Sequence, residues 1–136
     1  MENTKEQRKR KGNIDLNNME VIDVKAELLE TIKNIFEAIN RNDEKGRLQL
    51  MYDPIHFDEF GSDGPYILAI PKLELDNSRR DAIAEEYELD KIAEEVAIVK
   101  ITRKTLTTKL EDSLSTGDYI FIKTKSNQKW KLYRSQ

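Results

Sequence analysis

Residues 117–134 read GDYIFIKTKSNQKWKLYR, and this stretch decides the fold class of the chain. Two apolar runs flank a polar turn at 126–127, which is the pattern of a β-hairpin. In the first run, residues 119–122 are apolar on both alternating faces of the strand. Such a strand is typical of a sheet that is covered on both sides, so we expect structure above and below this hairpin.

Helices precede the hairpin. Apolar residues recur at three- and four-residue spacing from 19 to 39, which predicts one amphipathic helix of about twenty residues. Asn42 or Asp43 can cap a second, short helix over 44–51. A third helix is predicted over 79–88, after a group of capping residues.

Strands fill most of the remainder. The β-branched run 96–101 predicts a central strand, and 102–110 continue in strand-like residues, whereas 112–117 are expected to turn the chain. A short strand is predicted at 55–60, and 89–92 form either another short strand or a helical continuation. The order helix, helix, strand, helix and then antiparallel strands predicts an α+β architecture.

Composition limits the class of protein. The chain has 136 residues, enough for one domain with its own core. It has no cysteine, which excludes disulfides, thiolate catalysis and cysteine zinc sites. No apolar run approaches the roughly 18 residues of a membrane span, and the N-terminus lacks the apolar segment of a secretory signal. We therefore expect a cytoplasmic protein without a membrane partner.

Charge is distributed unevenly along the chain. Residues 1–13 hold five basic and two acidic side chains, whereas the whole chain carries a net charge of −3. Residues 1–18 are polar and lack periodicity, so we expect a disordered basic tail in front of one domain at 19–136. The acidic remainder repels nucleic acid, and a nucleic-acid partner is not predicted.

Three stretches carry a resemblance to a known family: FEAINRND at 36–43, HFDEF at 56–60 followed by GPY at 64–66, and EVAIV at 95–99. In this order, and with the hairpin and its KWK at 129–131, they resemble the nuclear-transport-factor-2-like superfamily, in particular its SnoaL-like branch. The resemblance covers about residues 20–134. It implies a cystatin-like, cone-shaped α+β fold, with about three N-terminal helices packed on a strongly bent antiparallel sheet.

The resemblance also bears on function. The implied conical pocket leads us to expect a small, mostly apolar ligand, with weak isomerase or lyase activity left open. A non-catalytic dimerisation or protein-interaction module with a filled pocket is the alternative. Many members pair through the outer face of the sheet, and the doubly apolar strand at 119–122 favours a homodimer of that kind. No cofactor is predicted.

Some members of the superfamily are ketosteroid isomerases, in which an Asp on the first strand moves a proton beside a carbonyl. Alignment on the following Phe60-Gly61 puts Asp58 at that position, and His56 shares its strand face as an orienting partner. The isomerases also use a Tyr on helix one as an oxyanion donor, but Ile35 stands there and cannot donate a hydrogen bond. Asp58 and His56 are the catalytic candidates; a polar strand-end residue and a hydrogen-bonded structural histidine are the alternatives.

The remaining candidates are apolar or aromatic side chains that can line the cone. The predicted pocket residues are Ile35, Phe36, Tyr52, Phe60, Tyr87, Tyr119 and Trp130. Ordinary packing explains the aromatic residues among them equally well. No metal site is predicted, because a metal usually needs three or four protein ligands and Glu59 points away from His56 and Asp58.

Overall fold

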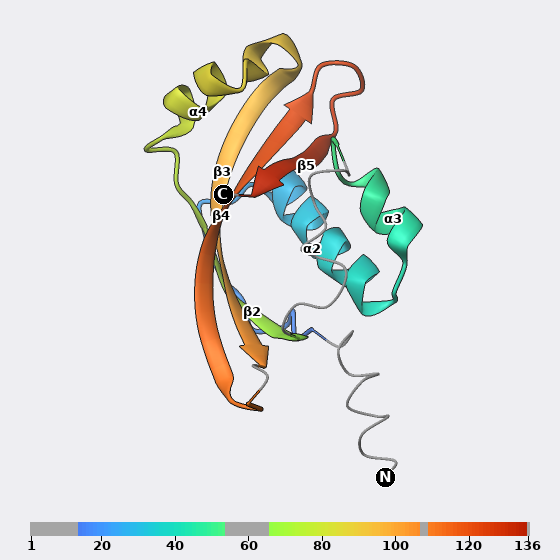
Figure 1. The fold of residues 1–136 in the computed structure, drawn as a ribbon. Coiled ribbons are helices and arrows are strands. Elements are labelled where there is room, and N and C mark those ends of the chain that lie inside the picture. Colours follow the sequence, from blue (N-terminus) through green and yellow to red (C-terminus); the bar gives the residue numbers. More distant parts are fainter. Residues whose placement is uncertain (1–13, 54–65, 107–108, 136) are drawn as a thin grey trace.

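The computed structural model describes residues 14–53, 66–106 and 109–135 of the chain. Its elements are, in chain order, β1 (Glu20–Ile22), α2 (Ala26–Asn40), α3 (Glu44–Gln49), β2 (Tyr66–Leu75), α4 (Arg80–Glu86), the 3₁₀ helix η3 (Leu89–Lys91), β3 (Ala93–Leu106), β4 (Asp112–Thr124) and β5 (Trp130–Ser135). Figure 1 shows α2 and α3 on one side of a curved sheet and α4 on the other. The α+β class predicted from the sequence is confirmed.

The described strands form one sheet in the order β1-β2-β3-β4-β5. Strands β2 to β5 are antiparallel neighbours, but the short β1 runs parallel to β2. The sheet is therefore mixed, and the expectation of an antiparallel sheet is wrong at this edge. Parallel pairing needs a long crossover between the two strands, and the segment that contains α2 and α3 supplies it.

Different helices cover the two faces of the central strands. In β3, Ala97, Val99 and Ile101 pack with α2 in one core cluster. The alternate residues Val96 and Ile98 pack with α4 and η3 in a second cluster. This separation follows from the two-residue period of a strand. We call the two sides of the sheet the α2 face and the α4 face, and the prediction of a sheet covered on both sides is confirmed.

The same alternation in β4 removes the reason for expecting a dimer through the outer sheet face. Tyr119 and Phe121 lie in the cluster of the α2 face, whereas Ile120 and Ile122 lie in that of the α4 face. Ile120 and Ile122 are fully buried within the chain itself. A second subunit is not needed to cover them, so the homodimer through that face stays a prediction without this support.

The segment ahead of α2 is extended and packed. Ile14 is 6% exposed, and its amide donates a hydrogen bond of 2.7 Å to the Asn40 side chain. Asp15 forms a parallel bridge with Ala69 of β2, and β1 follows along the same strand. The tail boundary that we predicted at residue 18 therefore has packed residues on its N-terminal side.

The three predicted helices are present with shorter bounds. The first begins at Ala26 rather than near residue 19, after Asp23 takes a left-handed backbone conformation with φ 59°. The second is capped as predicted, because the Asp43 carboxylate accepts a hydrogen bond of 2.9 Å from the Gly46 amide. The third is α4, and η3 after it corresponds to the helical continuation that we considered at 89–92.

The final hairpin is also present where it was predicted. Strands β4 and β5 pair from Lys123 and Trp130 onward, around a turn at 125–127. The Asn127 side-chain oxygen accepts hydrogen bonds from the Thr124 hydroxyl and the backbone amide of Lys129. Asn is a common turn residue for this reason, since its short side chain can bond nearby groups.

One segment predicted to turn is a strand, and another strand was not predicted at all. Residues 112–117, expected to turn the chain, form the first half of β4 and pair in register with the end of β3. The segment 66–75, for which no element was predicted, is β2, although it contains Pro71 and two register shifts. Pairing with distant strands, rather than local composition, makes both segments extended. The strand predicted at 55–60 lies outside the described residues.

Candidate functional site

Four of the predicted pocket residues come together on the α2 face. Ile35 and Phe36 come from α2, Tyr119 from β4 and Trp130 from β5, and all four belong to one core cluster. Their side chains are between 1% and 6% exposed. Helical spacing and strand alternation direct them inward, as the sequence predicts. In the described part of the chain these four residues act as packed core.

Two other predicted pocket residues lie elsewhere. Tyr87 packs against the cluster of the α4 face, and Tyr52 is 41% exposed. Both rings lie 5.7 Å from the ring of Tyr133, and the Arg134 guanidinium lies 4.7 Å from the centre of the Tyr87 ring. This group is an aromatic cluster with a cation–π contact at the β5 edge. It is separate from the four residues on the α2 face.

Asp58, His56 and Phe60, the remaining predicted site residues, lie outside the described residues. Their proposed roles as base, orienting partner and pocket wall stay predictions.

Beyond Ile101 the α2 face changes from apolar to polar. Along β3 the next two residues of this face are Arg103 and Thr105, which pair with Ser115 and Ser113 of β4. Arg103 is half-buried, Thr105 is buried, and the two serines are exposed. The long β3–β4 hairpin therefore carries a cation among hydroxyl groups directly beside the apolar core.

Arg103 is held by contacts on both strands. Its guanidinium lies 5.9 Å from the centre of the Tyr119 ring, and its Nη2 lies 3.4 Å from the Ser115 hydroxyl oxygen, which is long for a hydrogen bond. Its Nε is buried and has no hydrogen-bond partner among the described residues. Among the described residues, Arg47 of α3 also has a buried side-chain nitrogen, Nη1, without a hydrogen-bond partner.

No carboxylate among the described residues pairs with Arg103, whereas most other charged clusters are matched. A guanidinium offers up to five N–H donors in a planar fork, which suits a carboxylate, sulfonate or phosphate. Arg103 stands beside an aromatic ring and apolar core. This arrangement can therefore attract an anionic group to a cation that has an aromatic ring beside it.

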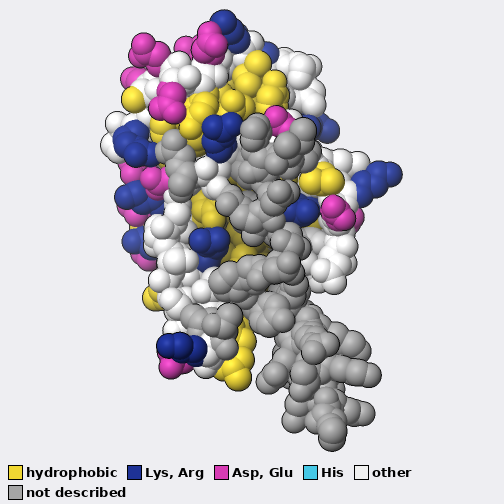
Figure 2. Space-filling view, viewed as in Figure 1, with side chains coloured by type: hydrophobic (Ala, Val, Ile, Leu, Met, Phe, Trp, Pro, Cys, Tyr) yellow, Lys and Arg dark blue, Asp and Glu magenta, His cyan; other side chains and the backbone are white. Residues whose placement is uncertain are grey.

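The surface around α4 has the opposite charge. Figure 2 shows acidic side chains gathered at the top of the view, where α4 lies. Asp81, Glu85 and Glu86 of this helix are all exposed. A surface of this kind repels phosphate-bearing polymers, so an anionic ligand is better placed on the α2 face.

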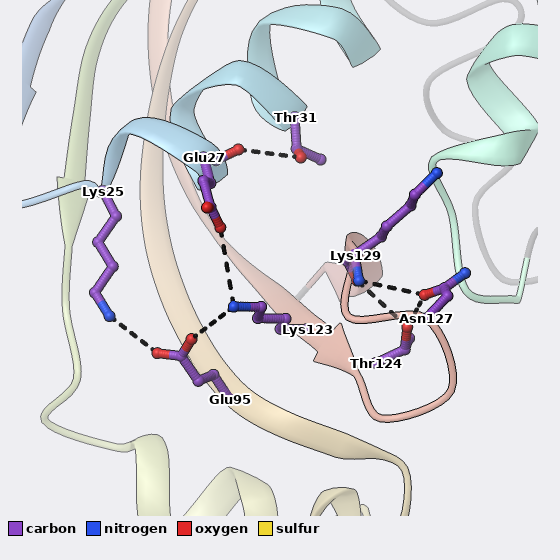
Figure 3. Close-up of polar contacts among 8 residues, drawn as sticks. All are labelled: Lys25, Glu27, Thr31, Glu95, Lys123, Thr124, Asn127 and Lys129. Carbon is purple, nitrogen blue, oxygen red and sulfur yellow. Dashed lines mark hydrogen bonds and ion pairs between the residues drawn. The ribbon is translucent and has the colours of Figure 1, made fainter.

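The other end of the α2 face carries a matched cluster of ion pairs, drawn in Figure 3. Glu95 of β3 lies 2.9 Å from Lys25 Nζ and 3.6 Å from Lys123 Nζ, and Lys123 is 3.9 Å from Glu27 of α2. The hydrogen bond from Lys25 is the main cause that lowers the pKa of Glu95, and the charge of Lys123 also contributes. Two cations and two anions compensate one another here. The cluster therefore joins α2 to the sheet and offers no unmatched charge.

Other kinds of site find little support in the described residues. They contain no group of three or more His, Asp or Glu side chains arranged to hold a metal. A shallow depression of about 550 Å³ runs along α3, bordered by Glu44, Lys45, Leu48 and Gln49. Three of these four side chains are exposed and polar, so they are not organised to orient a ligand. None of the described helices has the length and apolar character needed to cross a membrane.

Comparisons with models of protein families, with curated proteins and with solved structures find no match for this chain. The resemblance to the nuclear-transport-factor-2-like superfamily stays a prediction.

Arg103 is the site residue that sequence reasoning missed, although part of its signal is present. It stands two and four residues after Ile101 and Val99, so strand alternation alone puts it on the same face as two buried residues. The absence of a partner carboxylate has no signature in the sequence, because it depends on which residues of β4 lie opposite.

Proposed function

We propose that the protein binds a small, mostly apolar molecule that carries an anionic group, and that Arg103 holds this group. The observation that carries the proposal is the buried Nε of Arg103, which has no acceptor among the described residues. Leaving a buried donor unsatisfied costs about 1–3 kcal/mol, and more for a charged group. Such an uncompensated group calls for an explanation, and an anionic ligand supplies one.

The neighbours of Arg103 support an apolar body for the ligand. The Tyr119 ring belongs to the apolar core cluster and lies 5.9 Å from the Arg103 guanidinium. Gly117, which pairs with Ile101, carries no side chain, and a Cβ there would lie 3.4 Å from the Tyr119 ring. The ring thus lies against the Gly117 backbone and is a buried apolar neighbour of the cation. Aromatic carboxylates and similar amphipathic anions fit this pairing of ring and guanidinium.

The conical pocket of SnoaL-like proteins is the finer form of this proposal. A curved sheet with α2 packed on one face is the coarse arrangement that such a cone needs. Isomerase or lyase activity depends on Asp58 and His56, outside the described residues, so we propose binding and keep turnover as a prediction from the sequence. The cytoplasmic location and the homodimer through the outer sheet face likewise stay predictions from the sequence.

A non-catalytic interaction module with a filled pocket is the second candidate. It is favoured by the burial of Ile35, Phe36 and Trp130, which pack in one core cluster between α2 and the sheet. The two candidates differ in what Arg103 does. In a filled module its charge has no ligand to hold.

Calorimetric titration with a matched pair of probes tests the proposal. The probes are 1-naphthoate and its neutral amide, 1-naphthamide, which share one shape but differ in charge. We expect naphthoate to bind the native protein and to bind Arg103→Met about tenfold or more weakly, because a charge-assisted hydrogen bond is lost. Naphthamide should bind both proteins equally and weakly.

The stability of the unliganded variant gives an independent measurement. Without ligand, Arg103→Met should unfold at the same or a higher temperature, since it removes an unsatisfied charge and keeps an apolar stem over Tyr119. Arg41→Met, at an exposed arginine that pairs with Glu37 and Asp43, is the matched control and should leave naphthoate binding unchanged. Equal binding of naphthoate and naphthamide, or equal naphthoate binding by native protein and Arg103→Met, would contradict the proposal.

A further inference from the structure

The first half of β4 is an open edge of the sheet. Strand β5 pairs only with the second half of β4, from Tyr119 to Lys123. Residues 112–118 have β3 on one side and, within the described part of the chain, no strand on the other. In Figure 1 the β3–β4 hairpin extends downward past the end of β5. Along this edge, a row of backbone N–H and C=O groups therefore has no strand partner among the described residues.

The direction of these backbone groups follows from the final hairpin. The Thr124 amide donates a hydrogen bond to the Lys129 carbonyl, and the Thr124 carbonyl accepts one from the Gln128 amide. The backbone groups of Thr124 therefore face β5. Alternate residues of a strand share this direction, and the β3–β4 register is unbroken from Glu95 and Lys123 to the other end. Hence the even-numbered residues of β4 direct their N–H and C=O groups to the open side.

Apart from an Asp at each end, the edge lacks the devices that usually prevent pairing. Residues 112–118 read DSLSTGD, with no Lys, no Pro and no bulge. Leu114, in the middle of this stretch, is 67% exposed, and Leu110 at the tip of the hairpin is 72% exposed. Figure 2 shows hydrophobic side chains at the lower end of the molecule, where this hairpin lies.

We propose that this edge pairs with the same edge of a second copy of the chain. Two β4 strands would run antiparallel around a two-fold axis at Leu114, so that the sheets of the two copies become continuous. Leu114 then lies opposite Leu114 of the second copy, and Asp112 lies opposite Thr116. The backbones of all three residues face the open side, so each opposed pair exchanges two N–H···O bonds.

Avoidance of like-charge contacts favours this register for pairing with a second copy. A two-fold axis one residue further on, at Ser115, would oppose Asp112 to Asp118 of the other copy, and like charges directly opposite are destabilising. With the axis at Leu114, no two carboxylates are opposed within 112–116, and the exposed large hydrophobic side chain of the strand meets its own copy. The edge is therefore complementary to itself. The proposal rests on the backbone of β4 and does not depend on a ligand at Arg103.

A disulfide cross-link tests the register directly, because the native chain has no cysteine. Opposed residues in a hydrogen-bonded antiparallel pair have Cα atoms about 5.5 Å apart, within the range of about 4.4–6.8 Å for a disulfide. Under mild oxidation, Leu114→Cys should therefore convert to a covalent dimer. Leu110→Cys, an equally exposed leucine outside the strand, is the control and should stay mostly uncoupled.

Light scattering after size-exclusion chromatography gives the second measurement. The native protein should show twice the chain mass of 15.9 kDa at micromolar concentration, and Leu114→Lys should show a single chain mass with an unchanged circular dichroism spectrum. A native monomer, or a dimer that Leu114→Lys does not affect, would overturn the proposal. Cross-linking of Leu114→Cys no faster than that of Leu110→Cys would overturn it as well.

Discussion

Glu95 forms ion pairs with two separate segments of the chain on the α2 face. It contacts Lys25 from the segment ahead of α2 and Lys123 from β4. Both contacts favour the carboxylate, and the pKa of Glu95 is lowered from its ordinary value of 4.5. A carboxylate with a lowered pKa stabilises the fold above its unfolded pKa, and that contribution is lost as the pH falls through the folded value.

This linkage predicts a pH-dependent effect of Glu95→Gln. The variant should melt below the native protein at pH 7, and the difference should close as the pH falls below the ordinary pKa of 4.5 and then through the lowered pKa of the native carboxylate. The difference should also shrink at high salt, because Lys25 is 72% exposed at its side chain. Melting curves of native protein, Glu95→Gln and the neighbouring control Glu94→Gln across this pH range measure it. A difference that is the same at pH 7 and pH 3 would argue against the ion-pair role.

Arg103 shows the opposite balance of charge. Glu95 is satisfied by two cations, whereas Arg103 has one distant hydroxyl and one aromatic ring. Both residues lie on the same strand and on the same face, at opposite ends of the core. Glu95 is thus a matched structural charge, and the unmatched charge at Arg103 makes Arg103 a stronger candidate for binding than Glu95.

At the scale of elements, β4 has two halves that differ in burial. Its second half is buried on both faces, between α2 and the α4–η3 pair, and its first half is exposed. This division separates a structural half from a half that is available for binding. Ile120 is fully buried on the side that we had expected a second subunit to cover.

The cover of Ile120 by its own chain can be measured. Ile120→Ala should lower the free energy of unfolding by about 3 kcal/mol, since it removes a large part of a fully buried side chain. In the Leu114→Lys background, where edge pairing is blocked, this loss should be the same at low and high protein concentration. Urea unfolding measures the loss, and Val21→Ala at a 36% exposed position should cost much less. A loss that grows with protein concentration would indicate cover by another subunit.

Local patterns predicted the elements whose partners are close in sequence. The apolar spacing of α2, the Asp43 cap and the β4–β5 hairpin all follow from residues within a few positions of one another. The exposed half of β4 was mistaken for a turn, because Ser, Gly and Asp are common turn residues. It is a strand because residues 102–106 of β3 lie opposite, and that partner cannot be read from the segment itself.

At the scale of the whole molecule, the sequence did not predict that an N-terminal strand adds to the edge of the sheet beside β2. Strand β1 pairs in parallel with β2, beyond two intervening helices. Such long-range pairing leaves no periodic signal in so short a strand. The candidate site has the same limitation. Alternation puts Arg103 on the α2 face, but only the assembled sheet brings Tyr119 and Ser115 beside it and leaves its Nε without a partner.

The packing of the N-terminal segment predicts the effect of truncation. A chain that starts at Met19 loses Ile14, which is 6% exposed, together with the two hydrogen bonds that join Asp15 to β2. Burial of one such side chain contributes about 1.5–3 kcal/mol. The Asn40 side chain also loses its partner, because it bonds both the amide and the carbonyl of Ile14. We therefore expect the melting temperature to fall by about 5–10 °C.

A second truncation separates these contacts from the basic residues ahead of them. The control chain lacks only residues 1–13, which hold five basic side chains and for which the sequence predicts no packing. It should melt close to the native protein, whereas the chain that starts at Met19 should not. Differential scanning calorimetry of the three chains in the same buffer gives the comparison. If both truncated chains melt at the native temperature, Ile14 and Asp15 contribute little, and the domain boundary lies at residue 18 as the sequence alone predicts.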